Sequence, residues 1–370
     1  MFRLGIIGGG QLGKMMTQEA KRMGFWVTVL DPEPSSPAGQ VADQEITASF
    51  FDRKGLGMLV AQSDIVTYDI EHVDTEFLKD IPGVDKIHPA PPVLAVIQDK
   101  LKQKILLKEG GVPVPRFASS EEKEIWSSFG FPLVQKARYG GYDGKGVCVI
   151  QNEQALSQGI SGPAFFEEYV PLEKELSVLV ARNRTGEIAF YPVVEMFFES
   201  RANICDMVLV PARISREKSL EAQSIARRCV EILNGVGIFA VEMFLARDGR
   251  LLVNEVAPRP HNSGHFTIEA CVTSQFEQHL RAICGLPLGE TTLLSPAVMV
   301  NLLGEEGYRG TPCVEGLEEA LRIPGVSFHL YGKKETRPFR KMGHVTVLAQ
   351  SLDEAMVKAL RVKNLVKIRS

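Results

Sequence analysis

The sequence predicts a mixed α/β protein of more than one domain. A doubly wound parallel sheet is expected at the N-terminus, and a small β-rich domain at the C-terminus. Three observations predict this. The first thirty residues follow the order strand, glycine-rich turn, helix, strand, which is the pattern of a βαβ unit. From about residue 130 the pattern changes to strands joined by turns. The length, 370 residues, is enough for two or three domains.

The N-terminal unit consists of a buried strand at 3–8, a helix at 11–24 and a strand at 26–31. Gly8, Gly10 and Gly13 form the spacing G-x-G-x-x-G between the first strand and the helix. The N-terminus of a helix with small residues receives an anion, either a dinucleotide pyrophosphate or another phosphate. Asp31, at the end of the second strand, would contact a ribose in a dehydrogenase. The motif alone leaves a nicotinamide-dependent dehydrogenase open.

The later elements alternate between turn-rich junctions and hairpins. They are predicted as a strand at 64–73 entering a loop, a proline-rich then helical crossing at 87–100, strand–glycine loop–strand at 131–150, two strands across a proline-containing loop at 164–183, an amphipathic helix closed by glycines at 219–238, and a hairpin at 239–260 with its turn at 247–250. Short strands and a final helix at 353–362 complete the chain.

Composition and charge exclude several classes. The formal net charge is −3, so no overall field favours nucleic acid or a membrane surface. The six cysteines show no C-x-x-C spacing, and we expect reduced thiols. We find no secretory leader and no apolar run of the about 18 residues that a membrane span needs. A cytoplasmic protein is therefore expected.

Two carboxylates on the predicted hairpin are candidate metal ligands. Glu242 and Glu255 lie on its two strands, and Asn254 precedes the second. Ionised carboxylates in apolar surroundings need a cation. Oxygen ligands suit Mg²⁺, which commonly bridges carboxylates and nucleotide phosphates. On spacing alone, a magnesium site and a simple salt bridge both stay open.

A glycine-rich stretch, KARYGGYDGKGV at 136–147, is a candidate phosphate-binding flap. Its glycines leave backbone N–H groups available to phosphate oxygens, and Lys136 and Lys145 add charge. The spacing of a P-loop is absent, and a hairpin without a ligand is the alternative. In EEYVPLEKE (167–175), the backbone of Tyr169 and Val170 could bind an adenine and Glu175 a ribose hydroxyl. Taken alone, this stretch favours a solvated charged loop.

The segment NEVAPRPHNSGHFT at 254–267 is dense in polar groups. Arg259 and the histidines offer donors to an anion. His261 and His265 at i, i+4 suggest zinc, but no third ligand lies nearby in the sequence. Basic residues near the C-terminus, including Lys333 and Arg340, suggest a phosphate-anchoring turn. A nucleic-acid surface is less favoured, since stacking aromatics are not interleaved there.

These motifs, in this order, resemble the ATP-grasp superfamily and, within it, the N5-carboxyaminoimidazole ribonucleotide synthase family of purine biosynthesis. The motifs are GIIGGGQLGKMM, YDIEHV, KARYGGYDGKG, EEYV, NEVAPRPHNSGHFTIEA and YGKKETRPFRKMGHVTV, and they span residues 5 to 347. The resemblance implies an ATP-grasp fold. It has a Rossmann-like domain at 1–97, an ATP-grasp domain at 98–300 with a flap subdomain about 115–180, and a C-terminal domain at 301–370.

The resemblance also implies a reaction. ATP would phosphorylate bicarbonate to carboxyphosphate, and the amine of 5-aminoimidazole ribonucleotide would capture the carboxyl group, releasing ADP and phosphate. Mg²⁺ or Mn²⁺ would be needed, with neither biotin nor NAD, and a homodimer is expected. In this family the loop at Gly8 binds no dinucleotide, and Asp31 becomes an ordinary residue at a strand end.

The resemblance assigns roles residue by residue. Glu242 and Glu255 would hold the metal ion. The ATP contacts would be Lys100, Lys136, Gly141, Tyr142, Asp143, Gly144, Lys145, Gly146, Val147, Glu167, Glu168, Tyr169, Val170, Glu175, Asn254 and Glu255. The ribonucleotide and bicarbonate would meet Gly10, Gln11, Leu12, Glu71, Tyr142, Lys145, His261, Lys333 and Arg340. The catalytic candidates are Asp143, Lys333 and Arg340, with Asp143 as a proton acceptor.

Three positions depart from the family pattern, and three other functions stay open. Lys100 and Lys145 stand where arginine is frequent, which loses the bidentate fork. Phe198 stands near a family histidine, so that nucleotide contact is not transferred. The alternatives are another ATP-grasp ligase such as the formate-using glycinamide ribonucleotide transformylase, a nucleotide sensor without turnover, and the dehydrogenase.

Overall fold

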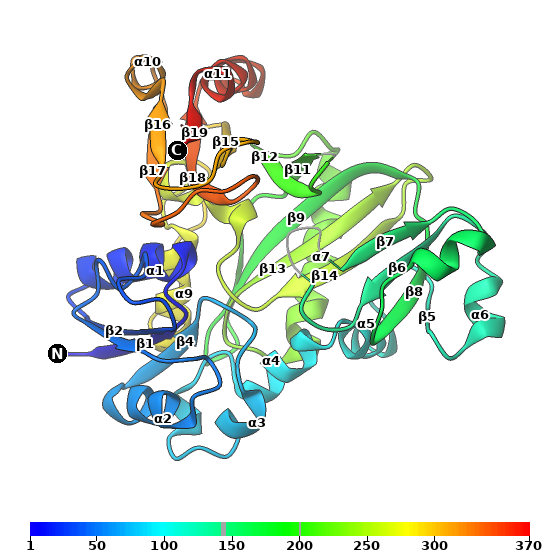
Figure 1. The fold of residues 1–370 in the computed structure, drawn as a ribbon, viewed down its shortest axis with the longest axis horizontal. Coiled ribbons are helices and arrows are strands. Elements are labelled where there is room, and N and C mark those ends of the chain that lie inside the picture. Colours follow the sequence, from blue (N-terminus) through cyan, green and yellow to red (C-terminus); the bar gives the residue numbers. More distant parts are fainter. Residues whose placement is uncertain (142–145, 200) are drawn as a thin grey trace.

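The N-terminal part of the chain folds around a parallel sheet. The computed structural model describes residues 1–141, 146–199 and 201–370. The sheet has the order β3-β2-β1-β4 and consists of β1 (Arg3–Ile7), β2 (Trp26–Asp31), β3 (Gln44–Thr47) and β4 (Ile65–Tyr68). Helices α1 (Gln11–Arg22) and α2 (Arg53–Gln62) pack on it (Figure 1). The predicted βαβ unit is confirmed, because β1 pairs with β2 in parallel.

Short helices lead from this sheet into the rest of the molecule. They are α3 (Thr75–Leu78), η1 (Val84–Lys86), α4 (Pro91–Gln98) and α5 (Lys100–Glu109). Pro91 starts α4, where the missing N–H of proline costs nothing. Asp99 ends α4 and caps α5, accepting hydrogen bonds from the N–H groups of Leu101 and Lys102. The proline-rich then helical crossing is thus confirmed.

A second, four-stranded sheet carries the glycine-rich stretch. Its order is β5-β8-β6-β7, with β5 (Phe117–Ser119), β6 (Leu133–Ala137), β7 (Val147–Ile150) and β8 (Ala164–Glu168). Helix α6 (Lys123–Ser127) and η2 (Glu153–Gln158) accompany it. Trp126 packs on Phe166 with ring centroids 4.6 Å apart. The predicted hairpin at 131–150 is confirmed, because β6 and β7 are antiparallel.

The large sheet in the centre of the molecule has the order β14-β13-β9-β11-β12-β15-β18-β17, with β10 paired to β9. Its first part comprises β9 (Leu172–Arg182), β10 (Ile188–Phe190), β11 (Val194–Glu199), β12 (Ile204–Val210), β13 (Gly237–Ala246) and β14 (Leu251–Ala257). Helix α7 (Arg216–Leu233) covers one face with a buried stripe that includes Ala226 and Val230. It ends at Asn234 in the left-handed conformation (φ 49°), not at a glycine as predicted.

Two features of this sheet depend on pairing between segments that are distant in the sequence. The two strands predicted at 164–183 exist, but β8 lies in the four-stranded sheet and β9 in the large one. Of the C-terminal strands, β16 (Cys313–Glu315) and β19 (Lys367–Arg369) form a two-stranded sheet of their own. The others continue the large sheet, since β12 pairs with β15 (Ala297–Leu303), which pairs with β18 (Lys341–Leu348) and that with β17 (Val326–Leu330).

The remaining elements close the structure around this sheet. They are η3 (Asn262–Gly264), α8 (Thr267–Ala270), α9 (Gln275–Ile283), β16 (Cys313–Glu315), α10 (Leu317–Leu321), α11 (Leu352–Leu365) and β19 (Lys367–Arg369). The C-terminal part docks on the N-terminal part. Gln40 Nε2 donates to Gly332 O (2.9 Å), and Lys14 Nζ to Tyr331 O (3.0 Å). None of the described helices has the length and apolar character needed to cross a membrane.

Candidate active site

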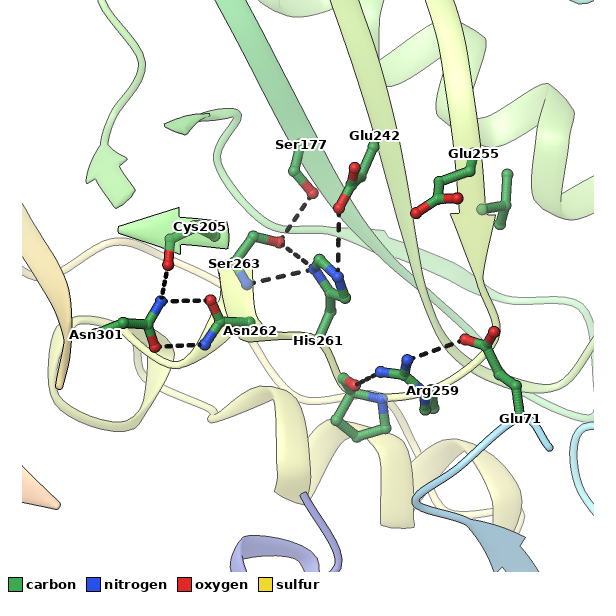
Figure 2. Close-up of polar contacts among 12 residues, drawn as sticks. Glu71, Ser177, Cys205, Glu242, Glu255, Arg259, His261, Asn262, Ser263 and Asn301 are labelled. Carbon is green, nitrogen blue, oxygen red and sulfur yellow. Dashed lines mark hydrogen bonds and ion pairs between the residues drawn. The ribbon is translucent and has the colours of Figure 1, made fainter. Parts of the chain in front are cut away.

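A pair of carboxylates lies on the β13–β14 hairpin. Glu242 and Glu255 are register partners, and the next pair is Met243 with Val253. Asn254 is therefore the extra residue of a β-bulge, which re-aims neighbouring side chains. Figure 2 shows both carboxylates turned toward the same region between the strands. The expected side-by-side arrangement of the carboxylates is confirmed.

The two carboxylates have opposite electrostatic surroundings. Burial, with the charges of Glu255 and Glu175 nearby, raises the pKa of Glu242. Burial also opposes ionisation of Glu255, but Lys100 outweighs it and lowers the pKa of Glu255. Lys100 Nζ lies 2.5 Å from Glu255 Oε2. Lys100 therefore stabilises the ionised form of Glu255 more strongly than that of Glu242.

The donor set fits a hard divalent cation. Glu242, Glu255 and the amide oxygen of Asn254 are oxygen ligands of the kind that Mg²⁺ prefers. Across the described ranges, no three His, Cys, Asp or Glu side chains gather closely enough to hold a metal ion. A cation here would take its other ligands from phosphate oxygens and water. The zinc alternative for His261 and His265 has no third ligand among these residues.

Three lysines surround the carboxylate pair. Lys136 Nζ donates to Asn254 Oδ1 (2.7 Å) and lies 2.8 Å from Glu167 Oε2. Lys104 Nζ lies 3.0 Å from Glu167 Oε1 and donates to Val253 O (2.9 Å). Burial lowers the pKa of Lys104 to about 8, against the pull of Glu167. Lys104 is absent from the sequence-predicted set. The one signal that could have identified Lys104 is that a charged residue stands on the buried face of α5.

The base of the predicted flap is attached to the start of α5. Arg138 Nη2 lies 2.5 Å from Asp99 Oδ2, and Tyr139 OH donates to the same oxygen (2.8 Å). Gly146 has φ +79°, and a Cβ there would come within 3.2 Å of Gly141 Cα. The predicted contacts Tyr142, Asp143, Gly144 and Lys145 lie outside the described residues.

The residues of the segment 167–175, which are predicted to contact the nucleotide, differ in their surroundings. Glu168 is paired with Arg116 (2.7 Å), and Tyr169 is half exposed. Val170 packs with Ala246 and Leu252. Burial raises the pKa of Glu175 to about 7, although Lys136 opposes this. Of this stretch, Glu167 and Glu175 face the lysine and carboxylate cluster.

The segment after β14 places a histidine beside Glu242 and an arginine beside Glu71 (Figure 2). His261 Nε2 lies 3.3 Å from Glu242 Oε1. Arg259 Nη2 lies 3.0 Å from Glu71 Oε1, and its Nη1 donates to Pro260 O (3.2 Å). Arg259 Nε is buried and has no hydrogen-bond acceptor among the described residues. A guanidinium held in this way retains a donor for an anion.

The glycine loop before α1 contacts carboxylates of the protein itself. Gly9 N–H donates to Asp31 Oδ2 (2.7 Å), so Asp31, the last residue of β2, holds the glycine loop. A Cβ at Gly10 would lie 2.5 Å from Asp69 Oδ2. Burial raises the pKa of Asp69 to about 6, while Arg259, the N–H groups of the loop and Lys333 counteract the shift. Asp69 was not predicted as a site residue.

The predicted C-terminal cations, Lys333 and Arg340, lie on the segment that joins β17 to β18. Lys333 Nζ donates to Lys341 O (2.7 Å), and its charge acts on Asp69. Arg340 Nη1 donates to Glu335 O (2.7 Å). Between them, Phe339 has φ 62°, an unfavourable conformation for a bulky residue. Strained backbone of this kind is frequent at ligand-binding turns.

Three family models match consecutive parts of the chain. They are the ribonucleotide synthetase preATP-grasp domain at 1–98, the ATP-grasp domain at 105–276 and the phosphoribosylaminoimidazole carboxylase C-terminal domain at 297–358. Together with the carboxylate pair and the lysines, these matches define an ATP-grasp enzyme. The predicted fold class is confirmed.

Similar proteins narrow this class. The N5-carboxyaminoimidazole ribonucleotide synthase of Bacillus subtilis is 44% identical over 359 residues, covering 95% of this chain and 92% of that protein. The crystal structure of the corresponding synthetase from Thermotoga maritima matches with 57% identity and a TM-score of 0.93, covering 100% of both chains. The Aspergillus clavatus synthase, in complex with ADP and 5-aminoimidazole ribonucleotide, matches with 35% identity and a TM-score of 0.89, covering 98% of each chain. This chain belongs to the N5-carboxyaminoimidazole ribonucleotide synthase family.

Proposed function

We propose that this protein is an ATP-dependent ligase that uses bicarbonate to carboxylate the exocyclic amine of 5-aminoimidazole ribonucleotide. The products would be the N5-carboxylated ribonucleotide, ADP and phosphate, a step of purine biosynthesis that we place in the cytoplasm. One observation supports the proposal beyond family membership. In the carboxylate pair that suits a nucleotide-bound cation, Glu242 Oε1 lies 3.3 Å from His261 Nε2. Two residues before this histidine, Arg259 has a buried Nε donor with no acceptor among the described residues.

The nucleotide side of the reaction would use the hairpin and the lysines. Glu242 and Glu255, with Asn254 beside them, would hold Mg²⁺ or Mn²⁺, which neutralises phosphate charge when bound. Lys100 and Lys136 would contact phosphate oxygens, since both ammonium groups border this cluster. Gly141, Gly146 and Val147 would cover the phosphates, and Glu167 and Glu175 would line the nucleoside side.

The acceptor side would use the loop after β14 and the C-terminal cations. Arg259 and His261 would orient the oxygens of bicarbonate and then of carboxyphosphate, leaving the carboxyl carbon open to the amine. The amine nitrogen forms the new C–N bond, phosphate leaves, and a base removes the ammonium proton; Asp143 is our candidate. Lys333 and Arg340 would bind the ribonucleotide phosphate near Gly10, Gln11 and Leu12, with Glu71 on the amino group.

Phosphate release from ATP tests this function. We expect release with Mg²⁺ to require both bicarbonate and the ribonucleotide, with formation of the carboxylated product. Release that depends on formate would indicate the alternative ligase, and ATP binding without any turnover would indicate a sensor. Light scattering after gel filtration would test the proposed homodimer.

A further inference from the structure

His261 is held from its Nδ1 side by a pair of buried serines (Figure 2). Its Nδ1 lies 2.9 Å from Ser263 Oγ, and the backbone N–H of Ser263 donates to the same nitrogen (3.3 Å). Ser263 Oγ lies 2.9 Å from Ser177 Oγ on β9. Both serines are fully buried, with an exposed fraction of 0%. The opposite nitrogen, Nε2, faces Glu242 Oε1.

These contacts define which ring nitrogen carries the proton in the neutral imidazole. A backbone N–H is always a donor, so Nδ1 must offer it a lone pair. The proton is then on Nε2. Because Nδ1 has no proton to give, the Ser263 hydroxyl donates to it. The hydroxyl of Ser177 in turn donates to Ser263 Oγ, which completes a chain directed at His261.

Fixing the loop does not by itself require the Ser263 hydroxyl. The next residue along from the histidine, Asn262, exchanges two amide hydrogen bonds with Asn301 on β15, at 2.9 and 2.7 Å. Asn301 also donates to Cys205 O (2.8 Å). The loop backbone is therefore already anchored to the large sheet. The serine pair acts on the ring itself.

We propose that Ser263, supported by Ser177, is a positioning residue that keeps His261 in the Nε2–H form, with this proton directed at the carboxylate pair. The proposal deepens the proposed function and rests on it for its purpose. A ring in this form is a hydrogen-bond donor toward the anionic oxygens of bicarbonate or carboxyphosphate. The other tautomer would present a lone pair to them and repel them.

The tautomer can be observed directly in the intact protein. Long-range ¹H–¹⁵N spectra of protein labelled with ¹⁵N-histidine, at pH 8, separate protonated from unprotonated ring nitrogens. The seven histidines are few enough to assign His261 by its loss in His261→Gln. We expect Nε2–H in the wild type. In Ser263→Ala the ratio of tautomers should shift toward Nδ1–H by about fivefold, the value of one ordinary hydrogen bond.

Kinetics should follow the tautomer. Ser263→Ala should lower kcat by about fivefold with an unchanged KM for ATP, and Ser177→Ala should act in the same direction but less. The matched control is Ser63→Ala, which removes another buried serine hydroxyl, bonded to Leu59 O (2.7 Å) in the N-terminal domain. It should change neither the tautomer nor kcat.

Each outcome decides the question. A wild-type His261 in the Nδ1–H form, or an unchanged tautomer in Ser263→Ala, would overturn the positioning role, whatever the activity. Lower activity with an unchanged tautomer would indicate a merely structural serine. A shifted tautomer in a protein that never consumes bicarbonate would support the positioning role and remove the proposed function instead.

Discussion

Replacing Glu167 with glutamine should leave two buried lysines, Lys104 and Lys136, without their shared counterion. Glu167 has an exposed fraction of 2% and lies 3.0 Å from Lys104 Nζ and 2.8 Å from Lys136 Nζ. The variant keeps the size of the side chain but removes its charge. Breaking a buried ion pair from one side costs about 3–5 kcal/mol, because a buried charge is left uncompensated. We expect a loss near the lower limit at pH 7, since Lys104 can become neutral.

The pH dependence follows from the pKa of Lys104. In the folded wild type it is about 8, against 10.5 for an ordinary lysine. Between these values the unfolded chain binds more protons, so stability rises with pH there. Without Glu167 the folded pKa falls below 8, and this rise begins at a lower pH. At pH values between the folded-state pKa of Lys104 in the variant and that in the wild type, the free energy of unfolding of the variant rises relative to that of the wild type. The rise is about 1.4 kcal/mol per pH unit.

Urea unfolding followed by circular dichroism between pH 6 and 8.5 measures this difference. The control is Glu168→Gln, which alters the neighbouring carboxylate. Its partner Arg116 has a side chain that is 59% exposed. The control should lose at most about 1 kcal/mol, independent of pH. Parallel stability curves for Glu167→Gln and the wild type would refute the argument that the carboxylate keeps Lys104 protonated.

Three further predictions concern the other contacts of the site. Glu255→Gln should abolish turnover and the stabilisation that Mg²⁺ gives in thermal unfolding; retained stabilisation would contradict its role as a ligand. Gly10→Ala should destabilise the fold by about 1–3 kcal/mol, because the new Cβ would lie 2.5 Å from Asp69 Oδ2, and an unshifted urea midpoint would speak against this. Asn301→Ala should lower the free energy of unfolding by about 1–3 kcal/mol, because the Asn262 amide loses its partner. Calorimetry measures this loss, and an unaltered melting temperature would contradict it.

Local patterns were sufficient for the elements that carry the site. Apolar alternation around the turn 247–250 predicts the β13–β14 hairpin, and the hairpin alone brings Glu242 opposite Glu255. The glycine spacing and strand pattern predict the βαβ unit and the β6–β7 hairpin. In each case the partners are close in sequence, so periodicity and turn residues define the pairing.

Long-range pairing and burial were decided by the tertiary structure alone. The assignment of β8 and β9 to different sheets, and the continuation of the large sheet into β15, β18 and β17, depend on contacts between distant segments. Three contacts of the site also depend on distant segments: the ion pair of Lys104 with Glu167, the approach of Asp69 to Gly10, and the serine pair behind His261. The sequence by itself determined the order of the elements and predicted the candidate residues that they carry. Only the tertiary structure decided which charges are buried together and which proton His261 presents, because dielectric surroundings and hydrogen-bond partners arise when distant segments pack.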